Sequence, residues 1–115
     1  MDNEVRIMCV KGDVAYEMIR ELIERRRRQV LVHSVIYYRF NSNIVTDAVW
    51  TSWAVELERL QAKYPEIAED CWYAEFFEDF DHSTGFNLPL DDPWAEQKAR
   101  YLMKIHKQFK GRVWT

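Results

Sequence analysis

Two apolar stripes with the spacing of an α-helix, the second of them at steps of three and four residues, dominate the chain up to Pro65. The first stripe comprises Ile19, Ile23, Val30 and Tyr37, with Leu31, Val35 and Tyr38 beside it. The second comprises Trp50, Trp53, Leu57, Leu60 and Tyr64. This spacing places apolar side chains on one face of an α-helix. The stripes therefore predict two long amphipathic helices that bury one face each.

Polar residues mark the ends of these helices. Asp13 and Thr46 are predicted N-caps, because their side chains can accept hydrogen bonds from the free N–H groups of a first turn. Asn41-Ser42-Asn43 separates the stripes, since Asn and Ser side chains compete for the backbone at helix ends. Pro65 ends the second pattern. Arg25 to Arg28, in the middle of the first helix, are expected to face solvent.

The remaining chain also predicts helices. Ile67 to Phe80 is acidic and aromatic, and we expect a helix with Trp72, Phe76, Phe77 and Phe80 in the core. A last helix starts at Pro93 behind the N-cap Asp92, and Gly111 can close it. Its inward residues are expected to be Ala95, Ala99, Leu102, Ile105 and Phe109.

The fold class predicted is all-α, with about four helices in a single domain spanning 1–115. Only three Gly and three Pro interrupt the chain, which favours long regular elements. The helix–turn–helix hairpin covers about 13–65 and the C-terminal helix about 93–110. Residues 1–12 alternate weakly, and a short strand and a helical turn both remain open there.

The hairpin carries a second pattern, around its turn. Tyr37-Tyr38 ends the first helix, a polar turn follows, and the second helix opens with Asp47-Ala48-Val49-Trp50-Thr51 and closes at Tyr64-Pro65-Glu66. This arrangement resembles the N-terminal Ia subdomain of NAD-dependent DNA ligases. That family has a Tyr-His pair, then Asp-x-x-Tyr-Asp, then Tyr/His-Pro-Glu, and these residues grip the nicotinamide mononucleotide half of NAD.

The resemblance implies a nicotinamide site formed by Tyr37, Tyr38, Asp47, Trp50 and Thr51. Tyr37 and Asp47 match the family residues and keep their spacing. Tyr38 replaces the family His, Trp50 the family Tyr, and Thr51 the second Asp, so one carboxylate and the imidazole are lost. NAD or nicotinamide mononucleotide is therefore the cofactor that the resemblance implies.

Catalysis is not expected. Covalent adenylation needs a nucleophilic Lys in a K-x-D-G motif within a large mixed α/β domain. Lys11-Gly12-Asp13-Val14 lacks the closing Gly and precedes the Ia-like helices, and the chain is too short to hold a ligase core as well. The isolated Cys9 and Cys71 are expected to be buried free thiols, and a metal site is not expected.

Charge is unevenly distributed along the chain. Glu66 to Asp92 contains nine acids and no Lys or Arg, whereas Lys98 to Arg112 is basic. We expect a protein partner to bind the first segment through Trp72, Glu75, Glu78, Asp79 and Asp81. A net charge of −3 argues against nucleic acid as a partner. No apolar run predicts a membrane span or a secretion signal, so a cytoplasmic location is expected.

Stand-alone proteins that resemble the Ia subdomain, with a stretch similar to Asp81-His82-Ser83-Thr84-Gly85-Phe86, occur in phage and prophage sequences. The resemblance thereby implies an accessory or host-directed role, such as inhibition of a bacterial enzyme or defence protein. Our leading interpretation is a non-catalytic protein-binding domain. The alternative is a module that binds nicotinamide mononucleotide or NAD.

Overall fold

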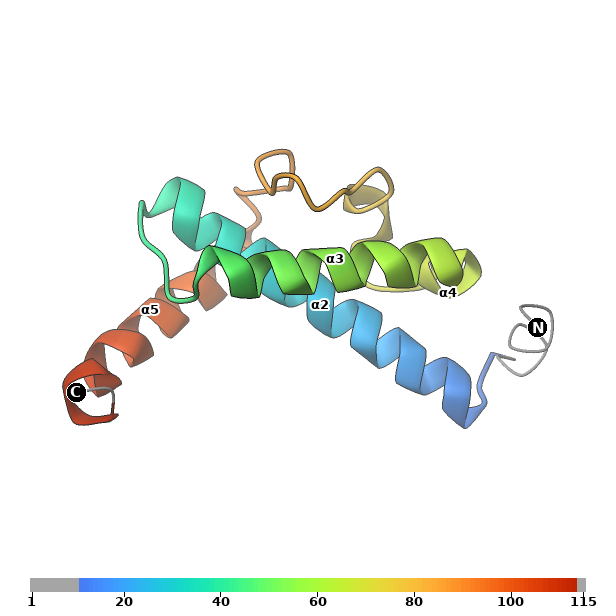
Figure 1. Ribbon diagram of the computed structural model, residues 1–115, viewed down its shortest axis with the longest axis horizontal. Coiled ribbons are helices and arrows are strands. Elements are labelled where there is room, and N and C mark those ends of the chain that lie inside the picture. The colour runs from blue at the N-terminus through green and yellow to red at the C-terminus, as the bar shows by residue number, and fades with distance from the viewer. Residues whose placement is uncertain (1–10, 114–115) are drawn as a thin grey trace.

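The computed structural model describes residues 11–113, with side chains up to residue 108. It contains four α-helices in this range, α2 (Val14–Arg39), α3 (Asp47–Lys63), α4 (Pro65–Glu69) and α5 (Pro93–Val113), and a 3-10 helix, η1 (Ala74–Phe76). The domain is all-α, as predicted. It measures 49 × 29 × 24 Å, with α3 and α5 packed against α2 (Figure 1).

Helix α2 begins at the predicted cap, because the Asp13 carboxylate accepts a hydrogen bond from the Tyr16 N–H at 3.0 Å. Its apolar stripe forms the centre of the core, where Ile23, Val30 and Val35 are fully buried. The helix ends at Arg39. Asn41 then adopts a left-handed conformation, with φ of 51°, which Asn tolerates better than most residues.

Helix α3 returns across α2 after this turn (Figure 1). The Thr46 hydroxyl caps it by accepting the Val49 N–H at 3.2 Å, as predicted. Leu57 is fully buried between the helices, while Trp50, Trp53, Leu60 and Tyr64 are half-buried against the core. The stripe of α3 therefore packs inward along its whole length.

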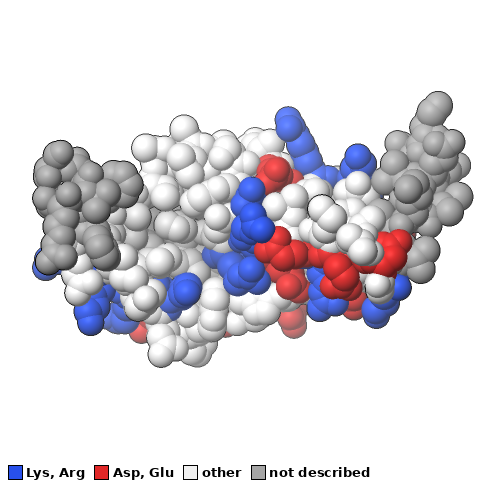
Figure 2. All heavy atoms as spheres, turned by 90° about the horizontal axis from the view of Figure 1, so that it is seen from below, with Lys and Arg blue, Asp and Glu red and all other residues white. Residues whose placement is uncertain are grey.

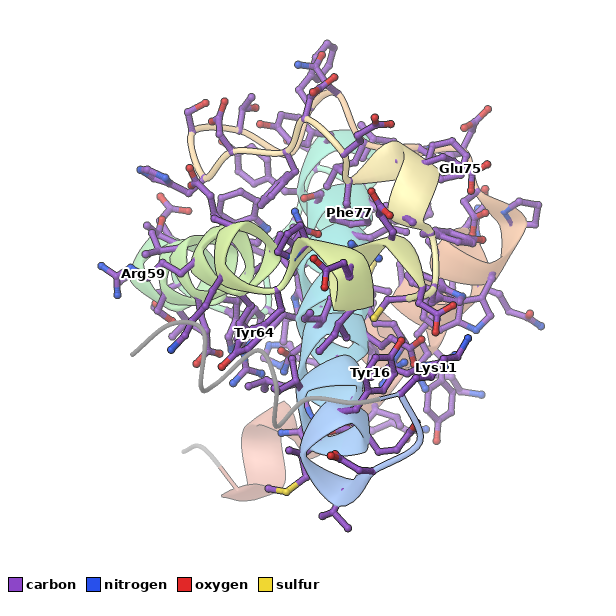
Figure 3. The ribbon with its side chains drawn as sticks, turned by 90° about the vertical axis from the view of Figure 1, so that its right-hand side faces the viewer. Lys11, Tyr16, Arg59, Tyr64, Glu75 and Phe77 are labelled. Carbon is purple, nitrogen blue, oxygen red and sulfur yellow. The ribbon has the colours of Figure 1, made fainter. Side chains whose placement is uncertain are left out.

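The predicted helix from Ile67 to Phe80 is wrong. Helix α4 stops at Glu69, and Tyr73 takes a left-handed conformation before η1. Its aromatic residues also divide differently, since Phe77 is fully buried but Phe76 is 46% exposed. Figure 3 shows Phe77 pointing inward and Glu75 pointing away from the body. The physical reason is that side chains of α2 and α3 bind carbonyls of this segment, at Ala68, Trp72 and Phe77, where a continuous helical ladder would otherwise run.

Arg27 provides two of those bonds. The prediction that all of Arg25 to Arg28 face solvent is wrong for Arg27, which is buried. Its guanidinium donates to the carbonyls of Ala68 at 3.0 Å and Trp72 at 2.9 Å, and to the Gln61 side chain at 2.9 Å. Four consecutive helical residues span most of a turn, so one of the four arginines must face the core.

Helix α5 starts at the predicted cap, where the Asp92 carboxylate accepts the Ala95 N–H at 2.9 Å. Ala95 and Ala99 are fully buried against α2, and their small side chains let the two helices approach closely. The helix continues through Gly111 instead of ending there. Phe109 lies outside the described side chains.

Two further predictions concern cysteines and membranes. Cys71 is a buried free thiol, as expected, and burial raises its pKa to about 11. Cys9, like the rest of residues 1–10, lies outside the described residues. Within residues 11–113, no helix has the length and apolar character needed to cross a membrane.

Candidate binding cavity

A cavity of about 220 Å³ lies where the hairpin turns. Three parts of the chain line it: the end of α2, the turn and first residues of α3, and the loop from His82 to Gly85. All five residues predicted for the nicotinamide site, Tyr37, Tyr38, Asp47, Trp50 and Thr51, are among the lining residues. The structure therefore brings these five residues together around one cavity.

Aromatic rings form much of this lining. The Tyr37 and Tyr38 rings meet edge to face with centroids 4.9 Å apart, and Tyr38 meets Phe86 in the same way at 5.4 Å. The Tyr38 hydroxyl lies 3.0 Å from the Thr84 hydroxyl oxygen, which ties α2 to the loop. Tyr37 is 52% exposed and Tyr38 40%, so both rings remain available to a ligand.

Hydrogen bonds and close packing hold Trp50 in the cavity lining. Its indole N–H donates to the Val30 carbonyl at 3.3 Å, and the Ser34 hydroxyl donates to the same oxygen at 2.7 Å. Gly85 presses onto this pair, because a Cβ placed there would lie 2.1 Å from the Ser34 Oγ and 3.2 Å from the Trp50 ring. Only glycine fits this contact between loop and helix.

Two histidines also line the cavity. His33 packs against Trp53 with ring centroids 5.3 Å apart, and burial lowers its pKa. Its Nδ1 is buried without a hydrogen-bond partner among the described residues. His82 is held by Glu58 of α3, whose carboxylate lies 2.7 Å from the His82 Nδ1 and accepts its backbone N–H at 3.2 Å. This carboxylate fixes the imidazole at the edge of the cavity.

Sequence analysis missed the contribution of the loop from His82 to Gly85. The loop is built locally: the Asp81 carboxylate accepts the Ser83 N–H at 2.7 Å, and the Thr84 hydroxyl accepts the Phe86 N–H at 3.1 Å. Gly85 was the available signal, since a glycine outside a predicted helix often marks a close backbone approach. Its partner, Ser34, is far away in sequence, and no local pattern identifies it.

The residues predicted for partner binding lie elsewhere, apart from Asp81, which adjoins the cavity loop. Trp72 is half-buried, stacks on Tyr73 with centroids 3.6 Å apart, and meets the Trp94 ring edge to face at 5.1 Å. Glu75, Glu78, Asp79 and Asp81 are exposed. We call these four acids, with Trp72, the acidic face.

Figure 2 shows the face seen from below, where acidic side chains gather in a band with Lys and Arg at its margins. Among the residues that the structure describes, no group of three or more His, Cys, Asp or Glu side chains is arranged to hold a metal ion.

Comparison of the chain with protein-family models, curated proteins and solved structures found no match.

Proposed function

We propose that the protein is a non-catalytic binding module whose cavity takes the nicotinamide end of NAD or nicotinamide mononucleotide. The observation that carries this proposal is the convergence of Tyr37, Tyr38, Asp47, Trp50 and Thr51 on one cavity. Aromatic rings with a few convergent polar groups are typical of small-molecule sites. The resemblance to the ligase Ia subdomain selects the same five residues independently of the fold.

The size of the cavity supports a ring-sized ligand. A cavity of roughly 150 Å³ accommodates benzene, and the volume here is about 220 Å³. A nicotinamide ring fits inside, while the ribose would lie at the mouth beside exposed Asp47 and Thr51. A carboxylate and a hydroxyl there can bind ribose hydroxyl groups.

Titration with nicotinamide mononucleotide, followed by NMR and calorimetry, tests the proposal. We expect saturable shifts at Tyr37, Trp50 and Thr51, and weaker binding in Asp47→Ala, because the ribose hydroxyl groups lose an acceptor. Asp91→Ala removes an exposed acid that does not line the cavity and should bind normally. Saturating ligand without shifts near the cavity would refute the proposal.

A second function, protein binding through the acidic face, has its own supporting observation. Trp72, Tyr73, Phe76 and Trp94 form a chain of ring contacts in which Phe76 and Trp94 are exposed, next to exposed acids. We propose that a basic partner, such as a host bacterial enzyme or defence protein, binds here in the cytoplasm. Affinity capture from bacterial lysate by the tethered protein, compared with a variant of this face, tests it.

A further inference from the structure

The charge of the cavity sets a further limit on its ligand. Asp47 contributes a carboxylate to the lining. Among the residues that the structure describes, no Lys or Arg lines the cavity. A phosphate group usually binds to such cations or to a helix N-terminus.

The two histidines do not reverse this balance. Burial lowers the pKa of His33, so its imidazole is neutral at neutral pH. His82 lies 2.7 Å from the Glu58 carboxylate. Whether or not the His82 imidazole is protonated, the His82–Glu58 pair carries no net positive charge. The lining and its paired groups are therefore negative overall.

The N-terminus of α3 favours an anion, because the positive end of its dipole meets the cavity at Thr46 and Asp47. That end is equivalent to about +0.5 elementary charge. The Thr46 hydroxyl already accepts the Val49 N–H, and the Asp47 carboxylate brings a full negative charge to the same turn. The carboxylate therefore outweighs the dipole.

We infer that the cavity selects an N-substituted pyridinium cation without a phosphate, of which nicotinamide riboside is the natural example, over the 5′-phosphorylated nucleotides. This inference rests on the proposed function and names the ligand form that the cavity prefers. The oxidised nicotinamide ring is a cation, and the faces of Tyr37, Tyr38 and Trp50 attract cations. Asp47 adds direct charge attraction to the ring and repels a phosphate held nearby.

Two matched ligand pairs test the inference by calorimetry at low salt. Nicotinamide riboside and nicotinamide mononucleotide differ by the phosphate. The cation 1-methylnicotinamide, methylated on the ring nitrogen, and nicotinamide differ in the ring charge. We expect the riboside to bind at least about fivefold more tightly than the mononucleotide, and the N-methyl cation more tightly than the neutral ring. Both preferences should shrink as salt is raised, because the cavity is open to solvent.

Asp47→Asn tests the origin of the preference, since it removes the charge and keeps a polar side chain of the same size. We expect it to reduce both preferences to less than about twofold, and Asp91→Asn to leave them intact. A mononucleotide that binds as tightly as the riboside would overturn the inference while leaving the proposed function standing. Preferences unchanged in Asp47→Asn would also overturn it. If none of the four compounds binds, the proposed function fails as well.

Discussion

Arg27 shows how one residue can decide the path of a distant segment. The guanidinium is buried, lies 5.4 Å from the centroid of the Phe77 ring, and binds the carbonyls of Ala68 and Trp72. It also holds Gln61, whose side-chain amide donates to the Phe77 carbonyl at 3.0 Å. A buried charge is expensive unless its hydrogen bonds are satisfied. Arg27 meets this condition by binding the Ala68 carbonyl within α4 and the Trp72 carbonyl after it.

We predict that Arg27→Met lowers the free energy of unfolding by about 3 kcal/mol, because the Trp72 carbonyl loses its donor and the Ala68 carbonyl keeps only backbone donors. Arg25→Met is the matched control, since among the described residues Arg25 pairs with exposed Glu21 alone, within α2. The control should cost less than about 0.5 kcal/mol. Urea unfolding measures both variants. Equal stability of the two would show that the Arg27 network does not hold the segment.

At the scale of elements, capping and periodicity were sufficient to predict the hairpin and α5. Asp13, Thr46 and Asp92 cap the three long helices as expected, because a cap is a local interaction between neighbouring residues. The segment between α4 and α5 could not be predicted in this way. Its conformation depends on Arg27, Gln61 and Glu24, which come from other helices. No local pattern in the segment records these long-range bonds.

The candidate site divides in the same way. The resemblance selected five residues from a short stretch of sequence around the hairpin turn, and all five line the cavity. Neither histidine was assigned to the site. His33 lies four residues before Tyr37 in α2, so helical spacing could have placed it there, whereas His82 reaches the cavity only in the folded chain. His82 depends on Glu58 of α3, and the loop that carries it depends on the contact between Gly85 and Ser34.

This loop contact gives an element-scale prediction. In Gly85→Ala the new Cβ would lie 2.1 Å from the Ser34 Oγ, so the loop must move away from α2 and carry His82 and Thr84 with it. We expect a loss of about 1–3 kcal/mol, the usual cost of overpacking, and weaker ligand binding. Adding Ser34→Ala removes the clashing hydroxyl and should restore at least about 1 kcal/mol. A double-mutant cycle without such coupling would disprove the contact.

The junction between α2 and the end of α4 gives a pH-dependent prediction. The buried Tyr16 hydroxyl donates to the Asp70 carboxylate at 2.7 Å, and Lys11 and Arg20 lie close to the same carboxylate. Figure 3 shows Lys11 beside Tyr16. These contacts hold the pKa of Asp70 below its usual value. Asp70, in turn, raises the pKa of Tyr16 to about 12.

The two shifts act at opposite ends of the pH scale. Because the folded pKa of Asp70 is lowered, its contacts stabilise the fold at pH values above its unfolded pKa of about 3.9. This contribution is lost as pH falls through the folded pKa. The raised pKa of Tyr16 stabilises the fold below about pH 10, and that contribution is lost as pH rises towards 12. We predict that the melting temperature of Tyr16→Phe depends less on pH than that of the native protein, in both the acidic and the alkaline range. Tyr101→Phe changes an exposed tyrosine and should leave the pH profile of the melting temperature unchanged. Identical profiles for Tyr16→Phe and the native protein would contradict the role of the Tyr16–Asp70 hydrogen bond.

At the scale of the whole molecule, some of the acids between Glu66 and Asp92 are bound within the fold and others are not. Asp70 and Asp92 are used within the fold, the first by Tyr16 and the second by Tyr73 and the cap of α5. Glu75, Glu78 and Asp79 are exposed and form no ion pair among the described residues. Unpaired like charges that lie close together repel one another. Nothing in the described fold offsets that repulsion.

A basic partner would offset it, and the neighbouring exposed Phe76 and Trp94 would supply apolar anchors. We predict that the double reversal Glu75→Lys and Glu78→Lys abolishes capture of a partner from bacterial lysate without lowering the melting temperature. The control reverses exposed Glu17 and Glu21 of α2, which changes the net charge equally and should leave capture intact.

Electrostatic complementarity mainly accelerates association, so the native complex should also form more slowly as salt is raised. This dependence separates a charge-complementary interface from apolar adhesion through Phe76 and Trp94, because adhesion of that kind does not weaken with salt. A partner retained by the Glu75 and Glu78 reversal, with unchanged affinity and salt dependence, would leave these acids as a solvated surface. The cavity at the hairpin turn would then be the remaining candidate for function.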